Sequence, residues 1–173
     1  MKRSRISEIL REGDAFIRSF GYFLPPFAHW SVADMRARDT SILQERGMGW
    51  DITDYGQEKF DDPGLFLFTT RNGIQAGLLS GRGMLYAEKI MISRQNQISP
   101  MHRHNLKAED IINKGGGRLV LELFAPNADG SIDRTGGVTV LVDGQMVNLP
   151  AGGLLKLDPG ESVTLLPGVW HAF

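Results

Sequence analysis

The stretch from residue 102 to residue 116 reads HRHNLKAEDIINKGG. It contains two of the chain's four histidines, His102 and His104, and a carboxylate, Glu109, five residues after the second histidine. In an extended segment alternate side chains lie on one face, so the two imidazoles point the same way and can bind one ion together. Five residues are enough for the chain to turn and bring Glu109 to the same point. A pair of exposed surface histidines is the alternative for an isolated His-x-His, and the surroundings decide between the two.

A second motif ends in another histidine. Residues 160–171 read GESVTLLPGVWH, ending at His171. The two segments have the spacings H-x-H-x4-E-x6-G and G-x7-G-x2-H, and these resemble the two sequence signatures of the cupin superfamily, in the same order. The resemblance implies one metal ion held by His102, His104, Glu109 and His171.

The chain departs from the cupin signatures at two positions. Asn96 stands where the first signature usually opens with glycine, and in the second signature Pro167 is adjacent to Gly168 instead of two residues before it. Neither departure replaces a predicted ligand, so the predicted metal site is unaffected.

The donor set limits the choice of metal. Three neutral imidazoles and one carboxylate suit a first-row divalent ion such as manganese, iron, cobalt, nickel or zinc. The chain has no cysteine, so thiolate ligands and disulfides play no part. The residues alone do not rank these metals.

Composition excludes several classes of partner. With 173 residues, 42% hydrophobic and 23% charged, the chain is typical of a globular protein with one sizeable core. The net charge is −1 and the charges are scattered, which predicts no nucleic-acid partner. No apolar run approaches the roughly 18 residues of a membrane span, and the charged N-terminus has no signal-peptide core, so we expect a cytoplasmic protein without a membrane contact.

The pattern of apolar and turn residues changes near residue 60. Residues 61–173 show short apolar runs separated by turn residues, which predicts a mainly β barrel or sandwich, and with the signatures a cupin jelly-roll barrel. Strands are expected at 65–70, 74–79, 85–92, 119–124, 137–141, 153–157 and 162–166. Residues 1–60 are expected to form a helical extension packing on the barrel, with an amphipathic helix from Ser4 to Phe20 and a second helix from Ser31 to Glu45.

Longer motifs narrow the resemblance and extend it over the whole chain. The chain is similar to the D-lyxose isomerase family of cupins in GMGWDITDYG (47–56), YAEKIM (86–91), PMH (100–102), EDIIN (109–113) and GGG (115–117). This resemblance implies a manganese-dependent enzyme that interconverts D-lyxose and D-xylulose, with D-mannose and D-fructose as a second pair. It also implies a homodimer. The residues allow a mechanism in which the metal polarises the sugar carbonyl and a base moves a proton between the first two carbons through an enediolate.

The resemblance assigns further roles in the site. Lys89 and Lys107 match the family pattern, and both could bring an ammonium to the developing oxyanion; Glu109 is expected to be a ligand, with a role as base left open. Two other residues are interpreted from the sequence alone. Glu122 either faces a substrate or lies on the outer face of its strand, whereas His29 has no partner in sequence and is expected to be structural.

Two questions stay open at the level of the sequence. Related isomerases continue through further strands that carry another acidic residue, so a chain stopping at Phe173 is either a truncated form or one that lacks those strands by nature. The rival functions are another metal cupin enzyme, such as an iron-dependent dioxygenase or a different sugar isomerase, and a non-catalytic sugar-binding cupin. The preferred sugar, the metal loaded in the cell and the catalytic base are not determined by the sequence.

Overall fold

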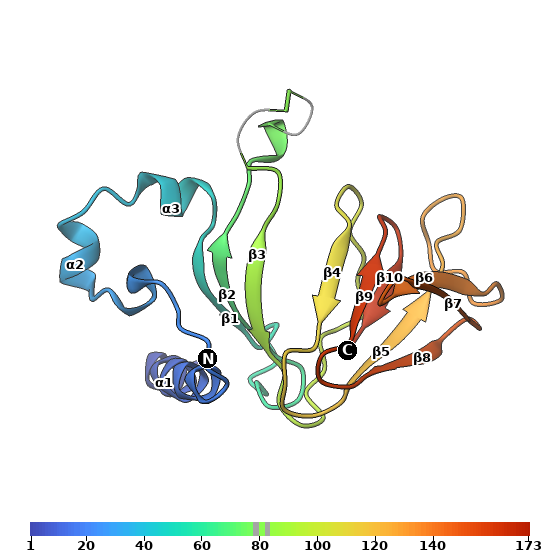
Figure 1. The fold of residues 1–173 in the computed structure, drawn as a ribbon. Helices are drawn as coiled ribbons and strands as arrows, with labels where there is room; N and C mark the ends of the chain where they lie inside the picture. The colour runs from blue at the N-terminus through green and yellow to red at the C-terminus, as the bar shows by residue number, and fades with distance from the viewer. Residues whose placement is uncertain (78–79, 82–83) are drawn as a thin grey trace. The chain divides into compact units, whose positions relative to one another are not determined.

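The computed structural model describes residues 1–77, 80–81 and 84–173, which divide into two compact units, Met1–Asn96 and Gln97–Phe173. The elements of the N-terminal unit (Figure 1) are α1 (Arg3–Ser19), η1 (Pro26–His29), α2 (Val32–Arg36), α3 (Ser41–Glu45), β1 (Gly49–Thr53), β2 (Leu65–Arg71), η2 (Gln75–Gly77) and β3 (Glu88–Ile92). Those of the C-terminal unit are β4 (Glu109–Ile112), β5 (Leu119–Phe124), β6 (Val138–Val142), β7 (Gln145–Leu149), β8 (Gly153–Leu157), β9 (Ser162–Leu165) and β10 (Trp170–Ala172).

In the N-terminal unit, helix α1 packs on an antiparallel sheet of order β1-β2-β3. The helix buries Ile9, Gly13 and Ile17, which recur every four residues and so form one stripe along its axis. The stripe lies against Phe66 and Phe68, which alternate along β2 and therefore point to the same side of the sheet. The apolar periodicity in the sequence thus produces this helix-on-sheet core.

Gly13 is the point of closest approach between α1 and the sheet. A Cβ atom at this position would lie 2.2 Å from the ring of Phe66, which is only 3% exposed and cannot move aside easily. We expect Gly13→Ala to lower the free energy of unfolding by about 1–3 kcal/mol, because overpacking outweighs the gain of about 1 kcal/mol that alanine brings to a helix. Urea unfolding measures the change. The double variant Gly13→Ala/Phe66→Leu should be more stable than Phe66→Leu alone, and the opposite order would contradict the steric explanation.

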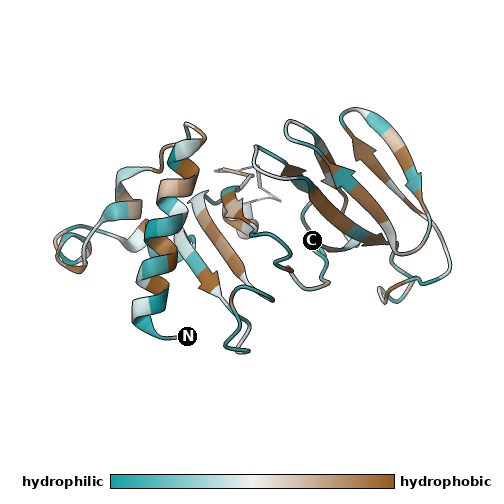
Figure 2. Cartoon of the chain, turned by 90° about the horizontal axis from the view of Figure 1, so that it is seen from below, coloured by the Kyte–Doolittle hydropathy of each residue, from teal (hydrophilic) through white to brown (hydrophobic). Residues whose placement is uncertain are grey.

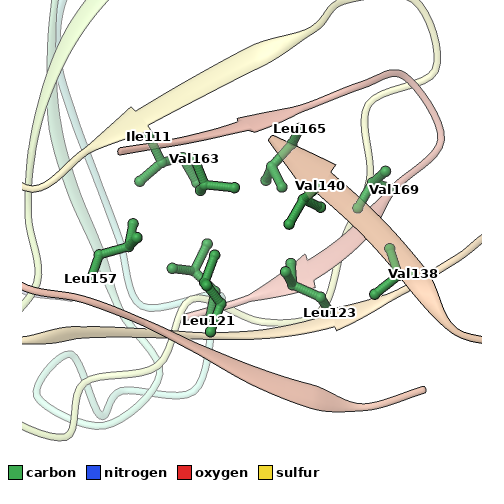
Figure 3. Packing of buried hydrophobic residues seen from close by; sticks show 10 residues of the cluster. Ile111, Leu121, Leu123, Val138, Val140, Leu157, Val163, Leu165 and Val169 are labelled. Atoms are coloured by element: carbon green, nitrogen blue, oxygen red, sulfur yellow. The ribbon is translucent and has the colours of Figure 1, made fainter. Parts of the chain in front are cut away.

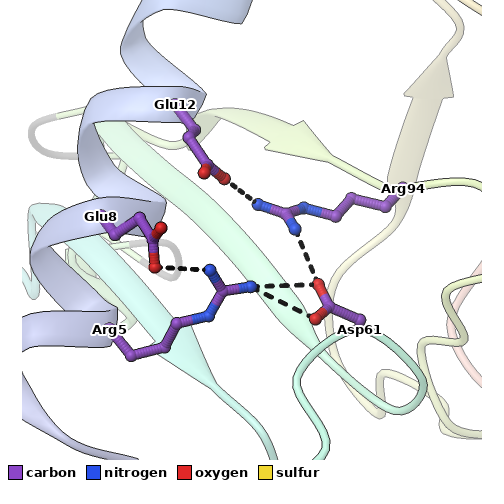
Figure 4. A network of polar contacts seen from close by, with 5 residues as sticks. All are labelled: Arg5, Glu8, Glu12, Asp61 and Arg94. Atoms are coloured by element: carbon purple, nitrogen blue, oxygen red, sulfur yellow. Dashed lines mark hydrogen bonds and ion pairs between the residues drawn. The ribbon is translucent and has the colours of Figure 1, made fainter.

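A network of charged side chains joins α1 to the rest of the N-terminal unit (Figure 4). Arg94, after β3, donates to Asp61 at 2.7 Å and to Glu12 at 2.5 Å. Arg5 donates to Glu8 at 2.7 Å and also reaches Asp61 at 3.2 Å. These side chains are partly exposed, and single exposed pairs contribute little to stability, so the network mainly fixes the orientation of the helix.

The C-terminal unit consists of two antiparallel sheets, of order β10-β5-β8 and β4-β9-β6-β7. Figure 3 shows their facing side chains, with Leu121 and Leu123 of β5 opposite Val163 and Leu165 of β9. All four are at most 2% exposed. Two sheets that enclose one apolar core are typical of a jelly roll, and hydrophobic residues concentrate on these strands in Figure 2.

The structure confirms the predicted fold class: it is mainly β, with antiparallel sheets of a cupin-like type and an N-terminal helix. Strands β5 and β8 have the predicted bounds, and α1 lies within one residue of the prediction. The proposed boundary between an extension (1–60) and a barrel (61–173) stays a prediction. None of the helices in the described ranges has the length and apolarity needed to cross a bilayer.

Several local predictions were wrong. The expected helix 31–45 is two short helices, although its capping box between Ser31 and Asp34 is present. Ser4 does not cap α1, whose N-cap is Lys2. Residues 75–77 of the expected strand 74–79 form η2, while residues 78–79 lie outside the described part of the chain. Strands β1, β4, β7 and β10 were missed.

Candidate metal centre

Backbone pairing brings His102 and His171 together. Each donates its N–H to the carbonyl of the other, at 3.0 Å and 2.8 Å, which makes them directly opposite residues of an antiparallel bridge. Side chains opposite each other in such a bridge lie on the same face. The two imidazole rings are accordingly 4.2 Å apart between centroids.

The strand register directs His171 and Glu109 toward the core of the C-terminal unit. His171 pairs with Leu123 of β5, and Glu109 pairs with Leu165 of β9. Both leucines belong to the buried cluster, so their cross-strand partners point to the same inner side. His104 is held by its carbonyl, which accepts from the N–H of Gly168 at 2.8 Å.

These four residues form one cluster. One potential ligand atom from each of His102, His104, Glu109 and His171 lies within 4.8 Å of the other three. The Oε2 atom of Glu109 is 3.1 Å from Nε2 of His104 and 3.4 Å from Nε2 of His171. The spacing of the sequence signatures therefore corresponds to a real convergence of donors, as the sequence predicted.

The hydrogen bonds of the rings suit metal binding. Nδ1 of His102 lies 2.8 Å from the carbonyl of Pro100, and Nδ1 of His171 lies 3.1 Å from the carbonyl of Val169. A carbonyl can only accept, so each Nδ1 carries the proton and each Nε2 lone pair is left for a ligand role.

The Nε2 atom of His171 shows whether the cluster fits a metal ion. The residue is 1% exposed, and this atom has no hydrogen-bond partner in the described part of the chain. The contact with Oε2 of Glu109 at 3.4 Å is too long for a good hydrogen bond, and it places two acceptors side by side when the proton is on Nδ1. A buried acceptor without a partner is costly, and a cation at the cluster would satisfy it. The residues present fit a divalent ion.

The electrostatics keep the donors in the required protonation states. Burial lowers the pKa of His102 and of His104, so both rings are neutral near neutral pH. Burial by itself raises the pKa of the Glu109 carboxyl, whereas the positive charge of the Lys107 ammonium lowers it, and the net result is a lowered pKa. Two neutral imidazoles, from His102 and His104, and an ionised carboxylate are suitable donors for a divalent cation.

The other predicted residues have different positions. Lys107 is half-exposed, and its Nζ lies 3.4 Å from Oε1 of Glu109, at the edge of the cluster. Lys89 lies in the N-terminal unit, exposed on β3 opposite Thr69. Glu122 pairs with Ala172, one position away from the inward pair of Leu123 and His171, so it faces outward. Its outward alternative is therefore the correct one.

His29 is not part of the cluster. It lies in the N-terminal unit, where its Nε2 is 3.2 Å from a guanidinium nitrogen of Arg18 and 3.8 Å from a carboxylate oxygen of Asp14. These contacts support the structural role that was expected for it.

The reasoning from sequence missed the two carbonyl groups that orient the rings. Pro100 and Val169 each precede a histidine of the cluster by two residues, and each contacts the ring through its backbone carbonyl. Backbone acceptors leave no side-chain signal, so only the repeated i−2 spacing could have indicated them.

Comparison with known proteins gives a consistent result. A family model described as D-lyxose isomerase matches residues 1–173. A D-lyxose/D-mannose isomerase of Serratia proteamaculans is 43% identical over 176 residues, covering all of this chain and 76% of that protein. A protein of the same name from Escherichia coli O157:H7 is 44% identical over 177 residues, with the same coverage.

Proposed function

We propose, since the chain belongs to the D-lyxose isomerase family, that this sugar isomerase interconverts D-lyxose and D-xylulose at the cluster of His102, His104, Glu109 and His171. D-mannose and D-fructose form the second substrate pair. The observation that supports this most is the convergence of three imidazoles and one carboxylate on one point, in a chain whose relatives carry that name.

The four donor residues determine which chemistry a bound metal ion would supply. A divalent ion held there, proposed to be manganese, would polarise the sugar carbonyl as a Lewis acid and so acidify the hydrogen on the neighbouring carbon. The carbonyls of Pro100 and Val169 hold two of the imidazoles in the ligating tautomer. The low pKa of Glu109 keeps its carboxylate ionised, so that it can contribute negative charge at any pH where the enzyme works.

Proton transfer needs groups beside the ligands. Lys107 is a candidate because its ammonium lies at the edge of the cluster, where it could stabilise a developing oxyanion. Lys89 is proposed for the same task on the strength of the family resemblance. Either residue would leave the ligand set intact if it were replaced, so a lysine variant would separate catalysis from metal binding.

Four further features of the proposal rest on the family resemblance and on composition. They are manganese as the resident ion, a homodimer as the working form, the cytoplasm as the location, and a barrel that begins near residue 61. Neutral sugars as substrates agree with the near-zero net charge of the chain.

The proposal is tested by stripping the purified protein of metal with a chelator, reloading it with manganese, and offering D-lyxose and D-mannose in parallel. We expect ketose to form with both sugars after reloading and to fall to background in the stripped protein. A dioxygenase would instead consume oxygen with ferrous iron, which an oxygen electrode detects. Sugar binding without any ketose after long incubation would contradict the isomerase proposal and support a binding protein.

A further inference from the structure

We propose that Arg103, Trp170 and Gly130 form a clamp on the outer face of the C-terminal unit and position the ligand histidines from behind. The inference rests on the proposed metal centre and adds positioning residues to it. The clamp residues lie on the side of the chain opposite the ligands, so they do not touch the ion.

Alternation along the chain separates the clamp from the ligands. Arg103 stands between His102 and His104, whose side chains converge on the cluster, and Trp170 directly precedes His171. In extended chain, neighbouring side chains point to opposite faces. Arg103 and Trp170 are therefore directed away from the cluster, and the guanidinium of Arg103 lies over the Trp170 ring, 5.3 Å from its centroid.

Gly130 completes the clamp from a turn that is distant in sequence. Its carbonyl accepts the indole N–H of Trp170 at 3.1 Å. A Cβ atom on Gly130 would lie 2.5 Å from Nη1 of Arg103, so the guanidinium packs directly on the glycine backbone. Gly130 has a φ of +83°, a region that other residues rarely adopt. The turn thus contacts both side chains that lie behind the ligands.

The segment that carries His102 and His104 lies between the named strands, so its side-chain contacts matter for its position. Residues 103–108 belong to no strand. Backbone hydrogen bonds connect His102 to His171 and His104 to Gly168. The stacking of Arg103 on Trp170 adds a side-chain contact between the segment that carries two ligands and the strand that carries a third.

Because Arg103 is charged, the inference can be tested by the direction in which its replacement changes the manganese affinity. A guanidinium close to a metal site repels the ion, so electrostatics alone predicts that removing this charge tightens metal binding. A positioning role predicts the reverse, because the ligands lose their fixed geometry when the stack is lost. The two effects change the metal affinity in opposite directions, so the sign of the change shows which one is larger, and Arg103→Lys isolates the effect of the stack.

The experiment compares Arg103→Met, Arg103→Lys and the unmodified chain in titrations with Mn²⁺ alone. The electron paramagnetic resonance signal of free aqueous Mn²⁺ reports the unbound fraction, and chelator competition reports the release rate. We expect both variants to bind manganese about tenfold more weakly and to release it faster, a loss typical of groups that orient metal ligands. Arg103→Lys should lose affinity although it keeps the charge, because an ammonium does not stack as a planar guanidinium does.

Arg118→Met is the matched control. It removes the same charge from the same unit, but Arg118 pairs with Asp158 and touches neither the ligand segment nor Trp170 among the contacts of the described residues. Its manganese affinity should stay within about twofold of the unmodified chain, the scatter expected for a surface change. Thermal unfolding of the metal-free proteins should place all variants close to the unmodified chain.

Each other outcome overturns the inference in a distinguishable way. Unchanged or tighter binding by both Arg103 variants, including Arg103→Lys, which keeps the charge, removes the positioning role and leaves the metal centre standing. Weaker binding together with early unfolding of both metal-free Arg103 variants makes the clamp a general structural element. Absence of manganese binding in the unmodified chain overturns the metal centre, and the clamp with it.

Discussion

Replacing His171 with alanine is expected to lower manganese affinity more than about 100-fold and to bring isomerase turnover to background. The substitution removes one of the four donor atoms of the cluster. A water molecule is not expected to replace it, because His171 is only 1% exposed. Metal content after dialysis and ketose formation from D-lyxose measure the two effects.

Two further variants separate ligand loss from a loss of structure. His104→Ala should show the same loss of metal, and its half-buried side chain leaves a smaller cavity than that of the fully buried His171. His29→Ala is the matched control, because it removes the histidine that lies outside the cluster. It should retain metal and turnover. Full metal content in His171→Ala would show that the cluster is not the metal site.

The convergence of the four donor residues was predictable from sequence because their spacing reflects backbone geometry. His102 and His104 share a face through the two-residue period of extended chain, and the second signature ends at the residue that pairs with His102. The supporting groups were not predictable in this way. The carbonyls of Pro100 and Val169 act through the backbone, and the stack of Arg103 on Trp170 depends on a pairing between distant segments.

The fold was predictable where burial follows a simple period. Strand β5 alternates leucines with other residues, β8 is an apolar run between turn residues, and α1 has a regular apolar stripe; all three were placed closely. Strand β7 was missed because its sequence, Gln145 to Leu149, has no such alternation and forms by pairing with β6 across the Asp143-Gly144 turn. The prediction of one helix over residues 31–45 was wrong because the helix is interrupted between Arg36 and Ser41. The capping box marks where the first helix begins and does not show where it ends.

Leu157→Ala is expected to lower the free energy of unfolding by about 3 kcal/mol, within the range of roughly 2–5 kcal/mol for buried leucines. Leu157 is fully buried in the cluster between the two sheets of the C-terminal unit, where it pairs with Leu119 of β5. Closely packed neighbours from several strands cannot collapse into the space, so the cavity adds to the lost transfer energy. Urea unfolding of the metal-free protein is the appropriate measurement, because bound metal would add its own stabilisation.

Leu154→Ala on the same strand is the control for this prediction. Leu154 is 58% exposed, and the alternation along β8 directs it away from Leu155 and Leu157. It loses the same atoms, but we expect a change within about 0.5 kcal/mol, as for other surface substitutions. Equal losses at the two positions would mean that β8 is not buried on one face only. A much larger loss of unfolding free energy for Leu157→Ala, with the same slope against urea concentration, would show that the core between the two sheets stabilises the unit. The same core fixes the strand register that directs Glu109 and His171 inward.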